Sequence, residues 1–422
     1  MKLFKTLALG ALALAAASVA SATNVKVTGS SAFRKAVYAA VINRLGSGTV
    51  KAAYIGTALS GANQATFSNG TNSVQCCFAG SVGGVAWIIN DTNVATAPGG
   101  DTSKAWITVA KADAGATASI GAGTGFTITG GQSYADTAAV TTAGGWDSAS
   151  VADFTMSDSL QDSTPYDSVS TGLALTSGAT DSGSIGVAQF LFCKGVQQTG
   201  STYNWTGFTN MTALGFQSLA ANGNLKLSFF TGIAADSTTN VVLVGRDNDS
   251  GTRLATTFET GLGSVDTAMS QYKAFDASSN DVGTVSGAGA ITTLTLQGSL
   301  GGYVSGGHVK AVLNSAVDTA TRVGAKPVLL VGYVGSGDKP TNTAQFLTYN
   351  GVAQSDAATK TGQYSFWTYE QSYYKTTDAA KITVINGLSD SIQSTYATAA
   401  GGVTIASMLA SRTTEGSVIS AN

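Results

Sequence analysis

The chain has 422 residues, of which 22 are Lys or Arg, 24 are Asp or Glu and one is His, so its formal net charge is −2. Charged residues make up 11% of the chain, compared with roughly a quarter in an average soluble protein. The near-neutral charge argues against a nucleic-acid binder and against attachment to an anionic membrane surface, because both need a basic patch. The length exceeds the comfortable size of one core, so two lobes are expected.

The N-terminus has the layout of a secretory signal peptide. Two lysines occur within residues 1–5, and a Leu- and Ala-rich apolar stretch follows over 6–20. This stretch is shorter than the roughly 20 residues that span a bilayer. Cleavage is expected after Ala20 or Ala22, so we assign residues 1–22 to the signal peptide and expect a periplasmic or secreted protein.

The first element predicted after the signal peptide is a strand over 24–28, where apolar and polar residues alternate. A Gly-Ser-Ser turn follows at 29–31, and apolar residues at helical spacing then predict a helix over 32–45. A second Ser/Gly turn, Gly-Ser-Val-Gly-Gly at 80–84, also precedes a predicted helix. Strands that lead into helices through such turns are typical of α/β lobes, where ligands bind beyond the carboxyl ends of the strands.

The three cysteines allow few pairings, and two stretches of the chain are rich in small polar residues. Cys76, Cys77 and Cys193 allow one disulfide or none, and no clustered His or carboxylate predicts a metal site. Residues 91–150 are a low-charge mixture of Thr, Ala, Gly and Ser, which predicts a β-rich or loop insertion outside the lobe cores. The similar stretch 276–302 contains one predicted strand, at 291–296.

A second strand–turn–helix unit begins about two hundred residues after the first. A strand is predicted over 241–246, and a turn at 247–252 opens a helix that continues through Phe258. Arg246 at the strand end is a fork-shaped donor beside a hydroxyl-rich helix start, and this combination suits an oxyanion. Each Ser/Gly turn alone is a weak signal, because Ser is a common N-cap.

The remaining candidates have ordinary structural interpretations. His308 is the one histidine and lies in a Gly-rich stretch, so we expect a structural role. A Ser-His-Asp hydrolase is disfavoured, because no Gly-x-Ser-x-Gly elbow is present. Aromatic residues gather over 363–369 and at Tyr373 and Tyr374. They could form a sugar-stacking platform, but we expect them to pack in the hinge between lobes.

The segment from Arg246 to Thr252 resembles a motif of the phosphate-binding proteins of phosphate ABC transporters, which belong to the periplasmic solute-binding superfamily. The second-lobe motif of that family is an arginine, a few variable residues and Ser-Gly-Thr. Three further segments, 29–33, 80–85 and 152–158, are similar to the first-lobe motifs and occur in the same order. The resemblance covers the two lobe cores, about two thirds of the mature chain.

The resemblance implies a set of ligand-binding residues: Ser30, Ser31, Ala32, Phe33, Ser81, Asp158, Arg246, Ser250, Gly251 and Thr252. Asp158 is implied to accept a hydrogen bond from a protonated phosphate and so to discriminate against sulfate. The chain departs from the family at Ala32, where a Thr is usual, and at Asn248, where an Asp commonly orients the arginine. Asp247 or Asp249 could take over the second role. The insertion also separates two motifs that are normally close together.

The sequence therefore predicts an α/β, two-lobed periplasmic-binding-protein-like fold with a ligand cleft between the lobes and inserted Gly/Thr-rich β or loop segments. Lobe 1 is expected to comprise 23–195 and 355–422, with the insertion at about 91–150, and lobe 2 to comprise 196–354. The expected function is capture of phosphate or a related oxyanion by a monomer that serves an inner-membrane ABC permease, without cofactor, nucleic acid or catalysis. The alternative is a cell-surface or matrix protein that retains the fold without transport.

Overall fold

The computed structural model describes most of the chain after the predicted signal peptide. The described ranges are 22–46, 48–91, 106–121, 128–134, 146–147, 151–178, 183–264 and 266–422. The signal-peptide prediction and much of the 91–150 insertion therefore lie outside the described residues. Within those ranges, no helix has both the length and the apolar character needed to cross a membrane.

One mixed sheet of thirteen strands dominates the described part of the chain. Its order is β15-β16-β19-β13-β21-β11-β1-β4-β3-β2-β6, with β12 paired to β21 and β9 paired to β2. The strands of this sheet are β1 (Asn24–Gly29), β2 (Lys51–Ile55), β3 (Gln64–Ser68), β4 (Ser73–Cys77), β6 (Ala116–Thr117), β9 (Gln132–Tyr134), β11 (Phe154–Ser157), β12 (Thr176–Ser177), β13 (Ser184–Lys194), β15 (Asn224–Lys226), β16 (Asn240–Leu243), β19 (Val328–Gly335) and β21 (Trp367–Tyr374).

Helices and two-stranded ribbons cover this sheet. The helices are α1 (Arg34–Leu45), α2 (Ser81–Ile89), α3 (Val109–Asp113), α5 (Ser168–Thr171), α6 (Ala213–Asn222), α7 (Ser228–Thr231), α8 (Gly251–Glu259), α9 (Gly306–Asn314), α10 (Asp356–Lys360) and α11 (Ala379–Ser391). The ribbons pair β5 (Trp106–Ile107) with β10 (Trp146–Asp147), β7 (Ser119–Ile120) with β8 (Ile128–Thr129), β14 (Asn210–Met211) with β20 (Thr348–Tyr349), β17 (Tyr272–Phe275) with β18 (Thr293–Leu296), and β22 (Ala410–Ser411) with β23 (Ser420–Ala421).

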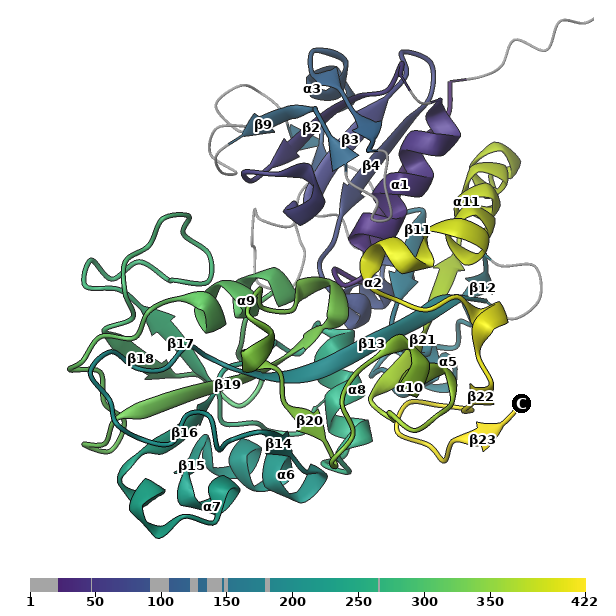
Figure 1. The fold of residues 1–422 in the computed structure, drawn as a ribbon. Helices are drawn as coiled ribbons and strands as arrows, with labels where there is room; N and C mark the ends of the chain where they lie inside the picture. Colours follow the sequence, from purple (N-terminus) through teal and green to yellow (C-terminus); the bar gives the residue numbers. More distant parts are fainter. Residues whose placement is uncertain are drawn as a thin grey trace, which may run out of the picture.

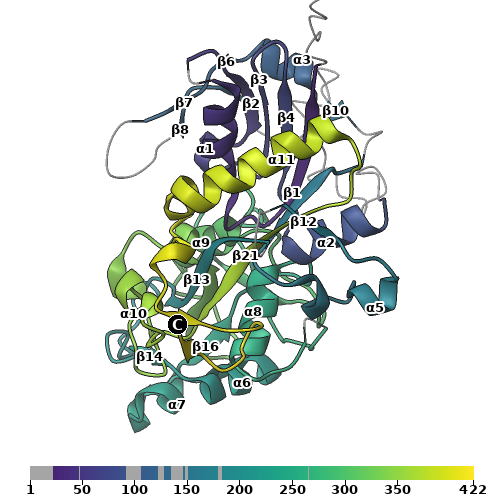
Figure 2. The ribbon, with the colours of Figure 1, turned by 90° about the vertical axis from the view of Figure 1, so that its right-hand side faces the viewer.

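The elements form two lobes, which confirms the predicted α/β, two-lobed architecture. Figure 1 shows β1 to β4, α1 and α3 in the upper lobe and β15 to β19 with α6 to α9 in the lower lobe. The strand β13 crosses between them, because it pairs antiparallel with β21 along one part and with β19 along the other. Near the C-terminus, α11 returns to the upper lobe and lies beside α1 (Figure 2).

The region where β13 crosses is packed with aromatic rings. The ring of Phe192 stacks on that of Phe366 with centroids 5.1 Å apart, and Phe190 and Tyr349 pack on the same Phe366 ring. All four side chains are buried. Phe366 therefore packs where β13 crosses between the lobes, as predicted, and its buried ring offers no platform for sugar stacking.

The structure corrects the prediction that the 91–150 insertion lies outside the lobe cores. Two of its strands, β6 and β9, pair directly with β2 of the main sheet. Trp106 is fully buried, with its ring 5.7 Å from that of Trp87 in an edge-to-face arrangement. The polar composition of the insertion did not predict these contacts, because single apolar residues such as Trp106 supply the packing.

Local predictions in the two strand–turn–helix units are confirmed with shifted bounds. The strand predicted over 241–246 ends at Leu243, and Arg246 forms an isolated bridge to Tyr303 instead of continuing the ladder. Similarly, the strand predicted over 291–296 is β18, which begins at Thr293. The three cysteines are all buried and free, so the alternative without a disulfide holds.

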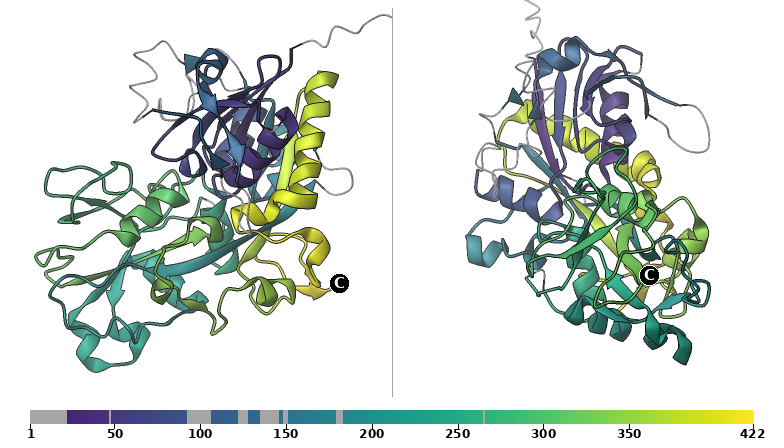
Figure 3. Two further views of the ribbon diagram at one scale, coloured as in Figure 1. Left: turned by 45° about the horizontal axis from the view of Figure 1, so that its top comes forward. Right: turned by 90° about the vertical axis from the view of Figure 1, so that its left-hand side faces the viewer.

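A buried ion pair connects the first helix to the end of β19. Nη2 of Arg34 donates to Oδ1 of Asp338 at 2.8 Å, and Nη1 donates to Oδ2 at 3.2 Å. Although burial acts in the opposite direction, the Arg34 charge holds the pKa of Asp338 below its ordinary value. Figure 3 shows how the upper lobe, which carries α1, sits over the lower lobe, which carries β19. The pair therefore contributes to holding the two lobes in register.

Replacing Asp338→Ala should lower the free energy of unfolding by about 3–5 kcal/mol, because Arg34 would be left as an uncompensated buried charge. Urea denaturation monitored by circular dichroism measures the loss. The matched control is Asp91→Ala, which removes the exposed pair with Lys375, formed at 2.8 Å, and should cost about 0–1 kcal/mol. Equal losses in the two variants would contradict the role given to burial.

Candidate functional site

Three parallel strand ends meet at one edge of the upper-lobe sheet. The strand β1 pairs in parallel with β4 on one side and with β11 on the other. Backbone hydrogen bonds fix the turns that follow: the Ser30 amide donates to the Met156 carbonyl at 2.7 Å, and the Gly80 amide donates to the Gly29 carbonyl at 2.9 Å. The predicted turns before α1 and α2 and the segment after β11 thus share one edge, as expected for a ligand site in an α/β lobe.

Gly29 is required at this edge for two reasons. Its φ of 108° lies in the region that favours glycine. In addition, a Cβ at this position would lie 1.9 Å from the carbonyl oxygen of Met156. The turn into α1 can therefore close against β11 only because residue 29 has no side chain.

The lower lobe contributes the start of α8. Ser250 is its N-cap, and the Ser250 hydroxyl accepts a hydrogen bond from the Arg253 amide at 3.2 Å. Ser250, Gly251 and Thr252 are all buried. The first turn of α8 therefore presents its amide groups inside the protein, where the positive end of the helix dipole has its largest effect.

The two lobes meet where Gly251 faces Ser81 and Asp158. A Cβ on residue 251 would lie 1.6 Å from Oδ1 of Asp158 and 2.6 Å from Cβ of Ser81. The Ser81 hydroxyl donates to Oδ1 of Asp158 at 2.5 Å. Close by, the Gly83 amide donates to the Asp249 carbonyl at 3.1 Å. The structure therefore brings together residues from two of the first-lobe motifs and the second-lobe motif.

Arg246 is held in a fixed orientation beside this contact. Its Nε donates to the Tyr303 carbonyl at 3.0 Å, its Nη2 to the Val304 carbonyl at 2.9 Å, and its Nη1 to the Thr252 hydroxyl at 3.4 Å. The residue is 2% exposed. Burial lowers the pKa of Arg246, while the negative charges of Asp247 and Asp158 act in the opposite direction. Arginine nevertheless stays charged in proteins, so Arg246 is a buried cation.

The carboxyl group of Asp158 is strongly perturbed. The residue is 1% exposed, and burial raises the pKa of Asp158 to about 6. The hydrogen bond from Ser81 and the charge of Arg246 lower this pKa, whereas the charge of Glu415 raises it. Asp158 is therefore a carboxyl group that changes protonation state near neutral pH.

Several hydroxyl groups around the strand ends are buried without a hydrogen-bond partner. They belong to Thr28, Ser30, Ser31 and Thr155. An unsatisfied buried polar group costs about 1–3 kcal/mol. Hydroxyl groups that can donate to a bound oxyanion would recover that cost, and those of Ser30 and Ser31 belong to the predicted set.

Two members of the predicted set direct their side chains elsewhere. A Cβ added at Gly335 would lie 3.1 Å from the Cβ of Ala32, so the Ala32 methyl group faces the end of β19. The Phe33 ring packs against Gly186 and Gly402, near the hinge. A ligand role for Ala32 and Phe33 would therefore have to come from their backbone amide groups.

The structure also identifies a residue that the sequence did not single out. Glu370 on β21 is fully buried, and neither of its carboxylate oxygens has a hydrogen-bond partner. Burial and the charge of Asp158 raise the pKa of Glu370 well above its ordinary value. The only signal in the sequence was an isolated acidic residue within an aromatic-rich strand.

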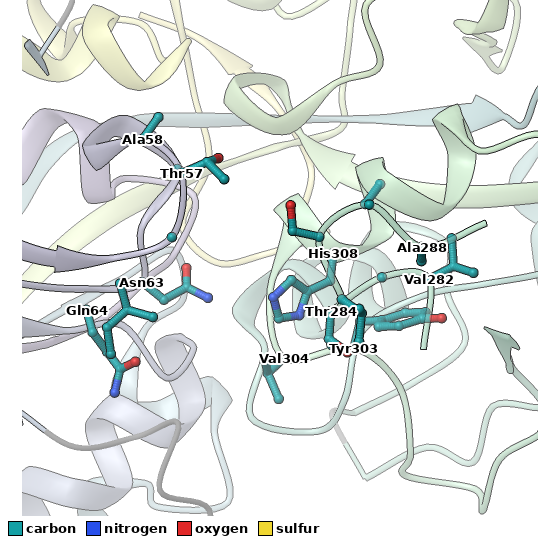
Figure 4. A pocket seen from close by; sticks show the side chains of 18 of the residues that line it. Thr57, Ala58, Asn63, Gln64, Val282, Thr284, Ala288, Tyr303, Val304 and His308 are labelled. Carbon is teal, nitrogen blue, oxygen red and sulfur yellow. The ribbon is translucent and has the colours of Figure 1, made fainter. Parts of the chain in front are cut away.

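A cleft of about 810 Å³ opens between the lobes next to these residues. Figure 4 shows Thr57, Asn63 and Gln64 on the upper-lobe wall and Tyr303, Val304 and His308 on the lower-lobe wall. Val304 is also the residue whose carbonyl binds Arg246. The cleft therefore borders the backbone that holds Arg246, although the side chains of the predicted set do not line it. The described residues contain no group of three or more His, Cys, Asp or Glu that could hold a metal ion.

No protein-family model and no curated protein matches the chain. Solved structures that are similar include a putative phosphate ABC transporter substrate-binding protein with bound phosphate from Clostridium perfringens, 10% identical with a TM-score of 0.44, covering 90% of this chain and 99% of that chain. An ABC-type phosphate transport receptor from Vibrio cholerae is 9% identical with a TM-score of 0.43, covering 90% and 99%. PstS from Borrelia burgdorferi is 9% identical with a TM-score of 0.35, covering 90% and 98%. The case for a site in this chain rests on the geometry described above.

Replacing Asp158→Asn should increase the free energy of unfolding at pH 8 by about 1–3 kcal/mol, because the folded state no longer has to bury an ionised carboxylate. The pKa of Asp158 is raised to about 6 in the folded state. The contribution of Asp158 to wild-type stability is therefore fully present below its unfolded-state pKa and is lost as the pH rises through 6. The gain should therefore disappear below pH 4. Urea titrations at pH 3.5, 5 and 8 measure it, and a gain independent of pH would contradict this interpretation.

Proposed function

We propose that this chain is a periplasmic solute-binding protein that captures phosphate or a related oxyanion for uptake by an inner-membrane ABC permease. The observation that supports this most is the meeting of Arg246, Ser81, Asp158 and the start of α8 between the two lobes. A buried guanidinium beside hydroxyl groups and helix N-termini matches the needs of a tetrahedral oxyanion. The proposed binding set keeps Ser30, Ser81, Asp158, Arg246, Ser250, Gly251 and Thr252, with Ser31, Ala32 and Phe33 contributing at the start of α1.

The charges at the site favour an anion that brings its own proton. The Arg246 cation attracts the anion, and an ionised Asp158 repels it unless a hydrogen bond is made between them. Phosphate near neutral pH carries a proton that it can donate to Asp158, whereas sulfate carries none. Burial and the charge of Asp158 raise the pKa of Glu370, which disfavours a second negative charge beside the anion.

The proposed mechanism is binding with closure of the lobes and no bond breaking. The lobes are joined through β13, which pairs with β21 and β19, so opening must bend the sheet near the aromatic hinge. Closure would bring Gly251 against Ser81 and Asp158 and exclude water from the anion. A monomer is sufficient for this mechanism.

Arg246→Ala should weaken phosphate binding by at least about 100-fold, because two charge-assisted hydrogen bonds are lost. Isothermal titration calorimetry on the mature protein at pH 7 measures the change. Arg322→Ala is the matched control, because the Arg322 guanidinium donates only to the carbonyls of Thr319 and Thr321. If the unaltered protein binds neither phosphate nor sulfate, the proposal is contradicted and the cell-surface alternative is favoured.

Asp158→Asn should reduce the preference for phosphate over sulfate at pH 7 by at least about 10-fold, because the amide can donate to an unprotonated anion. In the unaltered protein, sulfate affinity should rise as the pH falls from 8 to 5, since Asp158 becomes protonated near pH 6. Competition titrations at several pH values measure both effects. A phosphate preference that survives the substitution would remove Asp158 as the discriminating residue.

A further inference from the structure

The cleft between the lobes is much larger than an inorganic oxyanion needs. Its volume of about 810 Å³ lies in the range of about 300–1,000 Å³ that is common for pockets binding small organic molecules. On the upper-lobe wall, Phe78 and Ala79 directly precede Gly80 at the start of α2. On the lower-lobe wall, the Tyr303 and Val304 carbonyls accept from Arg246. The cleft is therefore adjacent to Arg246, and a ligand anchored there would enter it past the backbone of Tyr303 and Val304.

The cleft offers no free charge for a second ionic group. Of the described residues that line it, Lys273 is the one with a permanent charge. Its Nζ lies 3.6 Å from Oδ2 of Asp281 and 5.3 Å from the centre of the Tyr303 ring, so its charge is already compensated. His308 is neutral, because burial and the charges of Arg246 and Arg34 lower the pKa of His308 to about 4. A ligand group in the cleft is therefore expected to be uncharged.

Two residues on opposite walls each have a buried polar atom without a hydrogen-bond partner. These atoms are Oδ1 of Asn63 in the upper lobe and Nδ1 of His308 in the lower lobe. Figure 4 shows the two side chains on opposite walls of the cleft, with the hydroxyl-bearing residues Thr57 and Thr284 also lining it. Each unsatisfied atom costs about 1–3 kcal/mol. A ligand hydroxyl, which both donates and accepts, can satisfy either atom.

We propose that the ligand is a phosphate monoester, with its phosphoryl group at Arg246, Ser81 and Thr252 and its neutral, hydroxyl-bearing organic group in the cleft between Asn63 and His308. The proposal rests on the proposed function, because it uses the same anion site. Apolar side chains such as Ile55, Phe78 and Val282 line the same cleft and can contact the carbon skeleton of a polyol or sugar.

Calorimetric titration of the mature protein at pH 7 tests the proposal with four probes: inorganic phosphate, glycerol 3-phosphate, glucose 6-phosphate and 3-phosphoglycerate. At least one of the two neutral-group esters should bind at least about 10-fold more tightly than phosphate, since two new hydrogen bonds form. The carboxylate of 3-phosphoglycerate should make it at least about 10-fold weaker than glycerol 3-phosphate. If inorganic phosphate binds as tightly as glycerol 3-phosphate and glucose 6-phosphate, this inference is overturned and the proposed function still stands. No binding of any probe would overturn both.

Asn63→Ala and His308→Ala test where the organic group lies. Each should lower the ratio of ester affinity to phosphate affinity by at least about 5-fold. Asn222→Ala is the control, because this exposed side chain on α6 donates only to the Ser218 carbonyl and should leave the ratio unchanged. An unchanged ratio in both cleft variants would overturn the proposal. The Arg246→Ala variant should lose affinity for the esters and for phosphate alike.

Discussion

The approach of Gly251 to the Ser81–Asp158 hydrogen bond is the contact on which the candidate site depends. A Cβ at position 251 would lie 1.6 Å from Oδ1 of Asp158, so any larger residue would separate the lobes. With glycine there, the starts of α2 and α8 meet and water is excluded from the space around Asp158. This closeness contributes to the burial that raises the pKa of Asp158.

Burying ionisable groups is costly, and the protein offsets the cost in different ways. Arg34 and Asp338 neutralise each other through a two-point ion pair. Arg246 is surrounded by backbone carbonyls and by the negative charges of Asp247 and Asp158. The Asp338 charge also acts on Arg246, so the candidate site and the ion pair between α1 and β19 belong to one electrostatic network. An anion bound at Arg246 would add to this network where positive charge is already concentrated.

Aromatic packing around β13 joins the two lobes that form the candidate site. The sheet is continuous across the molecule through β13, and the aromatic rings around Phe366 fill the space where the lobes join. The cleft lined by Asn63 and His308 borders Val304, whose carbonyl accepts a hydrogen bond from Arg246 of the candidate site. A ligand that spans both regions would contact both lobes and favour the closed form.

The sequence by itself determined the two strand–turn–helix units, because hydrophobic periodicity and Ser/Gly turn chemistry are local properties. The family resemblance also predicted Ser81, Asp158, Arg246 and Gly251 as one set, and the structure places Gly251 against Ser81 and Asp158. Only the tertiary structure decided which distant residues join them. The antiparallel pairing of β11 with β21 brings Glu370 close to Asp158. Asp338 pairs with Arg34, which lies 304 residues away in the sequence. Packing between segments far apart in the chain likewise set the side-chain directions of Ala32 and Phe33 and buried Trp106. A local sequence pattern does not contain this information.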